Sequence, residues 1–482
     1  MEPKQLSGVS LIASRFTFHA SAVVYSSLTP RYSTGLDAFS AFWAHAVTLV
    51  WGLPLVIAVT GAGIFFTIIS RCAPYTVIGH TLAILRGRYD DPAKPGEVSH
   101  FQALTSALAG TIGLGNISGV AIAIGIGGAG AVFWMWVAAL CGMATKFFTC
   151  TLACMYRKTD ADGIAQGGPM YFIEVGLGPK FRPLAIMFAS CGMVGALPLF
   201  QSNQLATLLH TQWDLPALAT GLVAMVLVAA VELGGIRRIG AVTARAVPFM
   251  CMLYIASCLF VLLSHLPALP GVFRDIFTHA FGIEGIAGGA TGIALREIIV
   301  TGVKRATFSN EAGIGTEEMA HGAARTDEPV REGLVAMLGP VIDTHIICTM
   351  TALVILTSGV PLGSEGVAMV VSAFDQSMPG IGRPVLSMVL VLFAVSTMIT
   401  YSYYSVKCAT YLFGKRLGRA SVYIYIALIP VAAMWAQGTA VNIIDTAFAL
   451  MAIPTLTSTL LLSPRVVAAL KDYLRRMQLR NV

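Results

Sequence analysis

The amino-acid sequence predicts an all-α polytopic membrane protein, and three observations lead to that fold class. First, 56% of the 482 residues are hydrophobic and 11% are charged, with a mean hydropathy of +0.76, whereas a soluble domain carries roughly 25% charged residues. Second, apolar runs of about 20 residues, the length that a helix needs to cross a bilayer, recur along the chain. Third, two of these runs contain glycine clusters at corresponding positions, which is typical of transporters built from two inverted repeats.

We expect about eleven transmembrane helices. Residues 1–42 are predicted to form a poorly ordered N-terminal extension, and the first span, 43–69, a peripheral helix. The other ten spans divide into two five-helix repeats, 101–264 and 286–463, followed by a basic tail at 464–482. Because five is odd, the two repeats must have opposite topology. The predicted spans are 43–69, 101–124, 129–155, 183–210, 217–234, 241–264, 286–308, 332–358, 384–411, 421–436 and 440–463.

Basic residues indicate the orientation. Cytoplasmic segments of membrane proteins are enriched in Lys and Arg, and with the N-terminus outside, 24 of the 31 basic residues fall into cytoplasmic segments or the C-terminal tail. The external loops after the first span keep Arg274 and Arg383. We therefore expect a multi-pass protein of the plasma (inner) membrane, with its N-terminus outside and its C-terminus in the cytoplasm.

The composition also argues against several functions. The net charge of +7 is scattered along the chain, so the expected partner is the lipid bilayer and not a nucleic acid. No loop is long enough for a soluble domain, and no nucleophile and base stand at catalytic spacing, so we do not expect an enzyme. The nine cysteines form no CxxC pair, so neither a metal cluster nor a disulfide framework is predicted. We expect no cofactor, and the oligomeric state stays open.

The second span contains the most informative stretch, TIGLGNISGVAIAI, which begins at Thr111. Gly113, Leu114, Gly115 and Asn116 follow, and both glycine and an amide side chain disfavour a plain helix in hydrocarbon. Irregular backbone survives at membrane depth only where it is buried in protein or lines a cavity. The stretch is therefore a candidate binding element whose freed amides and carbonyls can hold a ligand and its ions. The alternative is close helix packing through small residues.

A matching interruption is predicted in the seventh span, the first span of the second repeat. Its sequence GIEGIAGGATGIAL contains Gly285, Gly288, Gly289 and Gly292. Paired interruptions at equivalent positions indicate a binding site at mid-membrane between the repeats.

Polar side chains in other spans are further candidates, because they are costly in hydrocarbon. The run QSNQ that begins at Gln201 either lines a cavity or joins helices by hydrogen bonds. In the ninth span, Ser396 and Thr397 offer hydroxyl oxygens suited to an alkali cation, and Tyr401 shares a helix face with Thr397. In the alternative, these hydroxyls bond their own helix one turn back.

Ionisable residues within the spans have two interpretations. Asp343 and Lys146 could belong to a proton or ion pathway, or to structural ion pairs, and for Lys146 we favour the structural role. Asp445 and Glu232 are expected to be solvated at span ends.

The polar segment 308–326, FSNEAGIGTEEMAHGAART, is predicted to lie on the cytoplasmic side. It could serve as a gate under the binding site. His321 is expected to be a solvated loop residue, because no Cys or His at metal-ligand spacing accompanies it.

Together these features resemble the alanine/glycine:cation symporter family, within the amino acid–polyamine–cation superfamily. The resemblance runs from about Trp51 to Arg465 and is carried by long stretches, among them FQALTSALAGTIGLGNISGVAIAIG, QSNQLA, FSNEAGIG, PVREGLVAMLGPVIDTHIICTMTALVIL and STMITYSYYS. It implies the LeuT-type fold of two inverted five-helix repeats. It also implies sodium-coupled symport of a small neutral amino acid by alternating access.

The resemblance further implies a site. The string GLGN at 113–116 is similar to the broken first helix of neurotransmitter:sodium symporters, so amides near Leu114 and Gly115 should meet the substrate carboxylate, and Gln201 its polar end. The residues expected to bind substrate are Thr111, Gly113, Leu114, Gly115, Asn116, Gln201, Gly289, Thr397 and Tyr401. The residues expected to enclose sodium, the coupling ion, are Ala109, Ile112, Ser396 and Thr397.

The chain departs from the family pattern around the pocket. Tyr401 stands where the family usually has tryptophan, which should enlarge the pocket or add a polar contact. Ala290 stands where span seven usually has phenylalanine, and Glu317 and Glu318 where small residues or proline are common. With these departures we do not expect strict selectivity for alanine and glycine, and the exact substrate stays open.

Two alternatives stay open. A proton could replace sodium as the coupling ion, with Asp343 as its natural carrier. A channel is disfavoured, because it would need a continuous polar lining and usually a symmetric oligomer.

Overall fold

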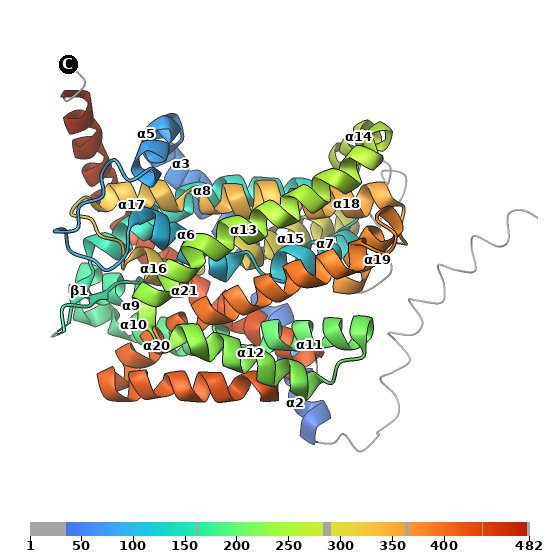
Figure 1. Cartoon of the computed structure of the whole chain (residues 1–482). Coiled ribbons are helices and arrows are strands. Elements are labelled where there is room, and N and C mark those ends of the chain that lie inside the picture. The colour runs from blue at the N-terminus through green and yellow to red at the C-terminus, as the bar shows by residue number, and fades with distance from the viewer. Residues whose placement is uncertain (1–34, 161, 283–290, 362–365, 436, 480–482) are drawn as a thin grey trace, which may run out of the picture.

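The computed structural model describes residues 35–160, 162–282, 291–361, 366–435 and 437–479. Its long helices lie side by side around one buried core (Figure 1). The short strands β1 (Lys158–Thr159) and β2 (Ala165–Gln166) form an antiparallel hairpin. The fold is therefore all-α, as predicted.

The elements fall into two halves. Short 3₁₀ or π-helical segments carry the label η. The helices up to α14 are α2 (Gly35–Val50), α3 (Leu53–Ile69), α4 (Ala73–Thr76), α5 (Ile78–Leu85), α6 (His100–Thr111), η1 (Gly115–Gly119), α7 (Val120–Gly127), α8 (Gly130–Met155), α9 (Pro169–Phe172), η2 (Ile173–Leu177), η3 (Pro179–Phe181), α10 (Arg182–Gly195), α11 (Leu199–Trp213), α12 (Ala217–Glu232), α13 (Gly235–Ser264), η4 (Leu266–Ala268) and α14 (Leu269–His279). Those that follow are α15 (Thr291–Asn310), α16 (Glu318–His321), α17 (Pro329–Ala336), η6 (Val341–Cys348), α18 (Thr349–Ser358), α19 (Val367–Ser377), α20 (Gly382–Ala433) and α21 (Gln437–Leu479).

Helices lie at the positions of the predicted spans, but the first predicted span is divided between α2 and α3, which are bent by 45°, and the fourth between α10 and α11. By length and hydropathy, six of the described helical segments can cross a membrane, or eight if each of two bent pairs counts as one span. Within α20 the backbone leaves the helix at Gly414 (φ 81°), which separates the ninth and tenth predicted spans. At the chain's ends, α2 begins inside the predicted extension, and α21 continues through the predicted tail to Leu479. Residues 1–34 lie outside the described ranges.

The first predicted interruption is present. α6 begins in a capping box, in which Ser99 and Gln102 bond each other's backbone amides. The helix ends at Thr111, and Ile112 has non-helical angles (φ −76°, ψ 88°). The chain becomes helical again at Gly115, in a direction bent by 55° from α6.

The described part of the second half contains a break that was not predicted. Residues 283–290, with Gly285, Gly288 and Gly289, are outside the described ranges. The described chain leaves the helix after Asn310 and returns at Glu318. Between them, Glu311, Gly313 and Gly315 have positive φ angles of 54°, 84° and 107°, a conformation that glycine adopts without steric cost.

The prediction that His321, in the segment 308–326, is solvated is wrong. Its residues are almost all buried, and His321 is fully buried with its Nδ1 bonded 2.6 Å from Glu332 Oε1. Glu332 also pairs with buried His100 through its other oxygen. Polar side chains from distant segments thus provide hydrogen-bond partners for the buried polar groups of this stretch, whose sequence alone resembles a loop.

Two further charges are buried against expectation. Asp445 is 1% exposed and forms an ion pair with Lys304, whose Nζ lies 2.7 Å from Asp445 Oδ2. The Nη2 atom of Arg305 lies 3.7 Å from the same oxygen. These two basic residues, which the charge count placed in a cytoplasmic segment, therefore lie inside helix α15. Glu232 is 6% exposed at the end of α12. The positions of Asp445 and Glu232 near span ends did not indicate that either residue is buried.

Candidate functional site

The break after α6 releases backbone groups at the centre of the molecule. The Gly113 amide, which in an unbroken helix would donate to Ala109, donates instead to Asn116 Oδ1 at 2.9 Å. The Leu114 amide points at Gln201 Oε1, 3.4 Å away on α11. Each of these residues is buried. The break therefore offers amide hydrogens and carbonyl oxygens in a dry environment, where they interact strongly with ions.

Asn116 joins this break to η6 of the second half. Its Nδ2 donates to Asp343 Oδ1 at 2.5 Å. Ser309 and Thr344 donate to the other carboxylate oxygen at 2.8 and 2.7 Å. Asp343 is completely buried, and its two oxygens accept these three hydrogen bonds. The arrangement holds both halves together beside the break.

Thr397 of α20 lies against the same break. A Cβ added at Gly113 would be 2.5 Å from Thr397 Oγ1, so only glycine permits this approach. The hydroxyl also donates to the Phe393 carbonyl one turn back, at 3.0 Å. Thr400, one turn further along, donates to the Ser106 carbonyl at 3.2 Å and so fixes α20 against α6.

The second break contributes Glu311, which sequence reasoning did not select. The Tyr401 hydroxyl and the Thr316 hydroxyl each donate to one of its carboxylate oxygens. Further along the same break, no side chain fits at Gly315, because a Cβ there would be 2.6 Å from Phe188 and from Thr455 Oγ1. The stretch NEAGIG is glycine-rich like the first break, and that signal could have identified it.

Aromatic rings surround the space between the two breaks. Phe308 lies 3.3 Å from the position of a Cβ at Gly115. Its ring centroid is 5.5 Å from those of Phe200 and Phe448. Phe448 in turn lies 6.3 Å from Tyr401. These three phenylalanines were not predicted, because an apolar residue in an apolar span carries no distinguishing signal.

The predicted site residues are largely brought together. Gly113, Leu114, Gln201 and Thr397 meet at the first break, as described above. Tyr401 instead faces the second break. Ala109 and Thr111 of α6 and Ile112 at the break are buried as well.

Among the described residues, the predicted ligand Ser396 has its contacts elsewhere. Ser396 is 6% exposed and directs its hydroxyl to Phe393 O and Met250 Sδ, at 3.0 and 3.5 Å. Gly289 lies outside the described residues.

Three buried carboxylates accompany a single lysine beside the second break. Glu311, Glu317 and Glu318 are each 1% exposed, as is Lys146. Lys146 bonds one oxygen of Glu317, while Glu317 Oε1 and Glu318 Oε2 have no hydrogen-bond partner among the described residues. The structural role expected for Lys146 is therefore that of an ion pair with Glu317.

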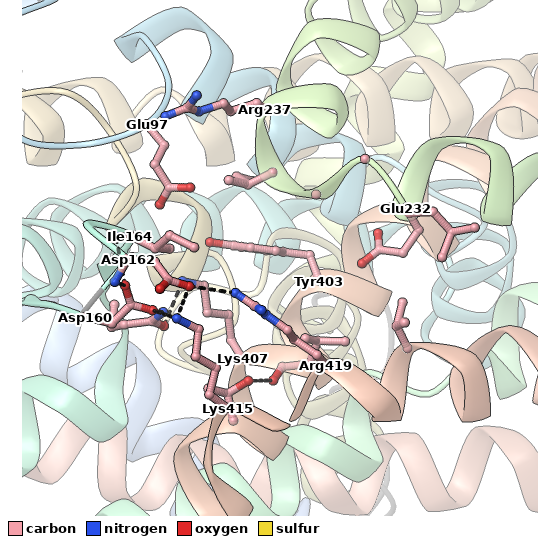
Figure 2. A pocket seen from close by; sticks show the side chains of 18 of the residues that line it. Glu97, Asp160, Asp162, Ile164, Glu232, Arg237, Tyr403, Lys407, Lys415 and Arg419 are labelled. Carbon is pink, nitrogen blue, oxygen red and sulfur yellow. Dashed lines mark hydrogen bonds and ion pairs between the residues drawn. The ribbon is translucent and has the colours of Figure 1, made fainter. Parts of the chain in front are cut away.

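Cavities lie on opposite sides of this centre. The larger one, here called the hairpin-side cavity, has a volume of about 600 Å³ and is lined by the β1–β2 hairpin, the start of α13 and the middle of α20 (Figure 2). A smaller one of about 190 Å³ lies between α11 and α19. The hairpin and α19 are at opposite ends of the long helices in Figure 1.

An ion-pair cluster covers the mouth of the hairpin-side cavity. Asp162, in the turn between β1 and β2, accepts hydrogen bonds from Lys415 and from Arg419, the latter at 2.8 Å. Donation by these two cations lowers the pKa of Asp162. Asp162 therefore keeps its negative charge at neutral and mildly acidic pH.

Comparison with known proteins assigns the family. The sequence model of the sodium:alanine symporter family matches residues 37–481. The chain belongs to the sodium:alanine symporter family. The sodium/alanine symporter AgcS of Methanococcus maripaludis is 38% identical, over 90% of this chain and 97% of the relative. An uncharacterized transporter of Haemophilus influenzae is 37% identical, over 90% of this chain and 96% of the relative.

A solved structure agrees with the fold. The crystal structure of MhsT in complex with L-phenylalanine has a TM-score of 0.59 at 13% identity, over 79% of this chain and 93% of MhsT. The likeness establishes the LeuT-type fold. This family member is thus a multi-pass membrane transporter that couples an amino acid to a cation, and not an enzyme.

Proposed function

We propose that this symporter carries a small neutral amino acid of the alanine/glycine class, together with sodium, by alternating access. The observation that carries the proposal is the break at 112–114, where amides and the Thr397 hydroxyl converge in a buried space. Freed amides suit an anion and freed carbonyls a cation. A relative that is 38% identical is named a sodium/alanine symporter, which supports the same choice of substrate and ion.

The substrate carboxylate binds at the amides of Leu114 and Gly115. Gln201, which now accepts from the Leu114 amide at 3.4 Å, turns toward the substrate when the carboxylate takes its place. Thr111, Gly113 and Asn116 complete this side of the site. Gly289, Thr397 and Tyr401 are proposed for the other side, and Phe308 and Phe448 limit the space for a side chain.

Sodium binds between α6 and α20. Its ligands are the carbonyl oxygens of Ala109 and Ile112 and the hydroxyls of Ser396 and Thr397. Because the two helices belong to different repeats, a bound ion favours the closed arrangement that also binds substrate. Ion and substrate then raise each other's affinity, which is the thermodynamic basis of coupling.

The hairpin-side cavity opens to the cytoplasm, and the cavity between α11 and α19 opens to the outside. Basic residues support this orientation, since Lys415 and Arg419 bond Asp162 of the hairpin and cytoplasmic loops are enriched in such residues. The N-terminus is then outside and the C-terminus in the cytoplasm, in a plasma (inner) membrane.

The test is uptake of labelled alanine into proteoliposomes, with sodium replaced by potassium and the pH gradient varied independently. We expect uptake to follow an inward sodium gradient and to be abolished in potassium. Uptake that is unaffected by the exchange of sodium for potassium would overturn sodium coupling. Absence of alanine, glycine and serine transport under every gradient would overturn the substrate class.

A proton is a second candidate coupling ion, and the buried carboxylates favour it. Glu311, Glu317 and Glu318 face one ammonium, that of Lys146, and an uncompensated charge in a dry interior takes up a proton instead. Asp343 accepts three hydrogen bonds that stabilise its charge, so it has less need of a proton than Glu318. The same proteoliposomes decide, because only a proton-coupled carrier acidifies the lumen during sodium-independent alanine uptake.

A further inference from the structure

The first span, formed by α2 and α3, precedes the two predicted repeats, yet it reaches the interior of the molecule. Trp51, at the bend between the two helices, is 5% exposed. Its indole Nε1 donates to the main-chain carbonyl of Asp445, 2.8 Å away on α21. Ser40 of α2 also bonds Thr439 of α21, with 2.7 Å between the hydroxyl oxygens. The span therefore follows the start of α21, and at Trp51 it meets a residue that carries a buried charge.

The indole of Trp51 also meets the cation that pairs with this charge. Lys304 Nζ lies 5.7 Å from the centroid of the Trp51 ring and 2.7 Å from Asp445 Oδ2. No hydroxyl or amide among the described residues donates to the Asp445 carboxylate. Its charge is therefore balanced by Lys304 and, at 3.7 Å, by Arg305. A buried ion pair is favourable only where its geometry is good, and Trp51 contacts both members of this one.

The ion pair lies one helix turn from the aromatic wall of the proposed pocket. Phe308 follows Lys304 by four residues on α15, and Phe448 follows Asp445 by three on α21, so each charge shares a helix face with one ring. The two rings are 5.5 Å apart, and the ion pair forms the next layer between the same two helices. Beyond Phe308 the chain passes through the second break toward the hairpin-side cavity. The ion pair is therefore on the side of the pocket away from that cavity.

The first span is held on its other side by α8. A Cβ added at Gly63 of α3 would be 2.5 Å from the Cys141 carbonyl oxygen of α8, so the two backbones approach closely there. α8 in turn packs along α15. The span thus contacts α8 and α21 together. An opening of the pocket on this side requires α15 to move away from α21, and that movement must change the contacts of Trp51.

We propose that Trp51 is a positioning residue for transport: it holds Lys304 against Asp445 and so stabilises the state in which the pocket is closed on the side away from the hairpin. The first span then takes part in transport, beyond the peripheral place that its sequence predicts. This rests on the proposed function, in which α15 and α21 contribute walls of the substrate pocket. Loss of the Trp51 contact favours the state that is open on this side.

The kinetics of sodium-driven alanine uptake into right-side-out vesicles test the proposal with Trp51→Phe, which keeps an aromatic ring and removes the N–H. The open state captures external alanine more readily but closes less readily. The half-saturating alanine concentration and the turnover rate should therefore both fall, by about fivefold, the equivalent of one hydrogen bond. The matched control is Trp43→Phe on α2, whose indole N–H has no acceptor among the described residues; it should behave as the wild type. A lower turnover rate with an unchanged half-saturating concentration in Trp51→Phe would reduce Trp51 to a structural role and overturn the proposal.

Thermal unfolding in detergent gives a second test, which does not depend on what is transported. Asp445→Asn removes the charge but keeps the carbonyl that Trp51 bonds. Trp51→Phe should destabilise this variant less than it destabilises the wild type, because the ion pair is already lost. Equal destabilisation in both backgrounds overturns the positioning role. Absence of sodium-driven alanine uptake in the wild type would overturn the proposed function instead, and the unfolding measurements would still decide whether Trp51 acts on the ion pair.

Discussion

The hydroxyl of Tyr401 donates a hydrogen bond to the carboxylate of Glu311. Tyr401 belongs to α20 and Glu311 to the break between α15 and α16, so this bond fixes one wall of the proposed pocket to the irregular backbone opposite. The sequence left two roles open for Tyr401, a larger pocket or an added polar contact with substrate. In the structure, the hydroxyl is already used by Glu311.

Removing this hydroxyl tests the relationship. Tyr401→Phe leaves a buried carboxylate oxygen without its donor, which costs about 1–3 kcal/mol. We expect a lower temperature of unfolding in detergent, together with weaker alanine uptake. An unfolding temperature equal to that of the wild type would show that Glu311 does not depend on Tyr401.

Tyr401→Trp tests the shape of the pocket. The indole is larger and cannot donate from the position of the phenol oxygen, so we expect preference to shift toward the smallest substrates. The measurement is competition of glycine, alanine and serine against labelled alanine. Unchanged competition by all three would exclude Tyr401 from the pocket wall.

The sodium site is tested at Thr397. Thr397→Ala removes one proposed oxygen ligand, and a loss of about 1.4 kcal/mol in ion binding raises the sodium concentration needed for half-maximal uptake about tenfold. Thr397→Ser keeps the oxygen and should behave nearly as the wild type. If the alanine and serine variants share the wild type's sodium dependence, Thr397 is not a ligand.

A fourth test concerns the close approach of the first break to α20. Gly113→Ala places a Cβ 2.5 Å from Thr397 Oγ1, and so close an overlap forces the two segments apart. We expect uptake to fall at least tenfold, on the order expected of small displacements in a preorganised site. Gly61→Ala is the control, because a Cβ there meets no atom within 4 Å. Normal uptake by Gly113→Ala would show that the break can move away without consequence.

The first break could be predicted from sequence because its signal is local. Gly113, Gly115 and Asn116 disfavour a plain helix within an apolar run, whatever surrounds them. The second break was not predicted, because the polarity of FSNEAGIG is also that of a solvated loop, although its glycines carry the same kind of signal as those of the first break. It is buried because its charges meet partners from distant segments: Lys146 reaches Glu317, and His100 reaches Glu332 beside His321. Such long-range pairs leave no local pattern.

The pair of Lys146 and Glu317 permits the sharpest test of that explanation. Both side chains are 1% exposed, so Lys146→Met leaves a buried carboxylate alone, at a cost of about 3–5 kcal/mol. The double variant Lys146→Met with Glu317→Gln removes both charges, and it should be more stable than Lys146→Met alone. Thermal unfolding of the single and double variants in detergent measures the coupling between the two residues.

The sign of this coupling also distinguishes a charged Glu317 from a protonated one. If Glu317 is charged because Lys146 is present, neutralising it restores most of the stability that Lys146→Met loses. If Glu317 already carries a proton in the folded protein, Lys146→Met costs little and the second substitution adds nothing. The first result is expected, because the ammonium lies within hydrogen-bonding distance of one Glu317 oxygen. Within this group of three glutamates, Glu311 and Glu318 then have no ion pair with a described cation.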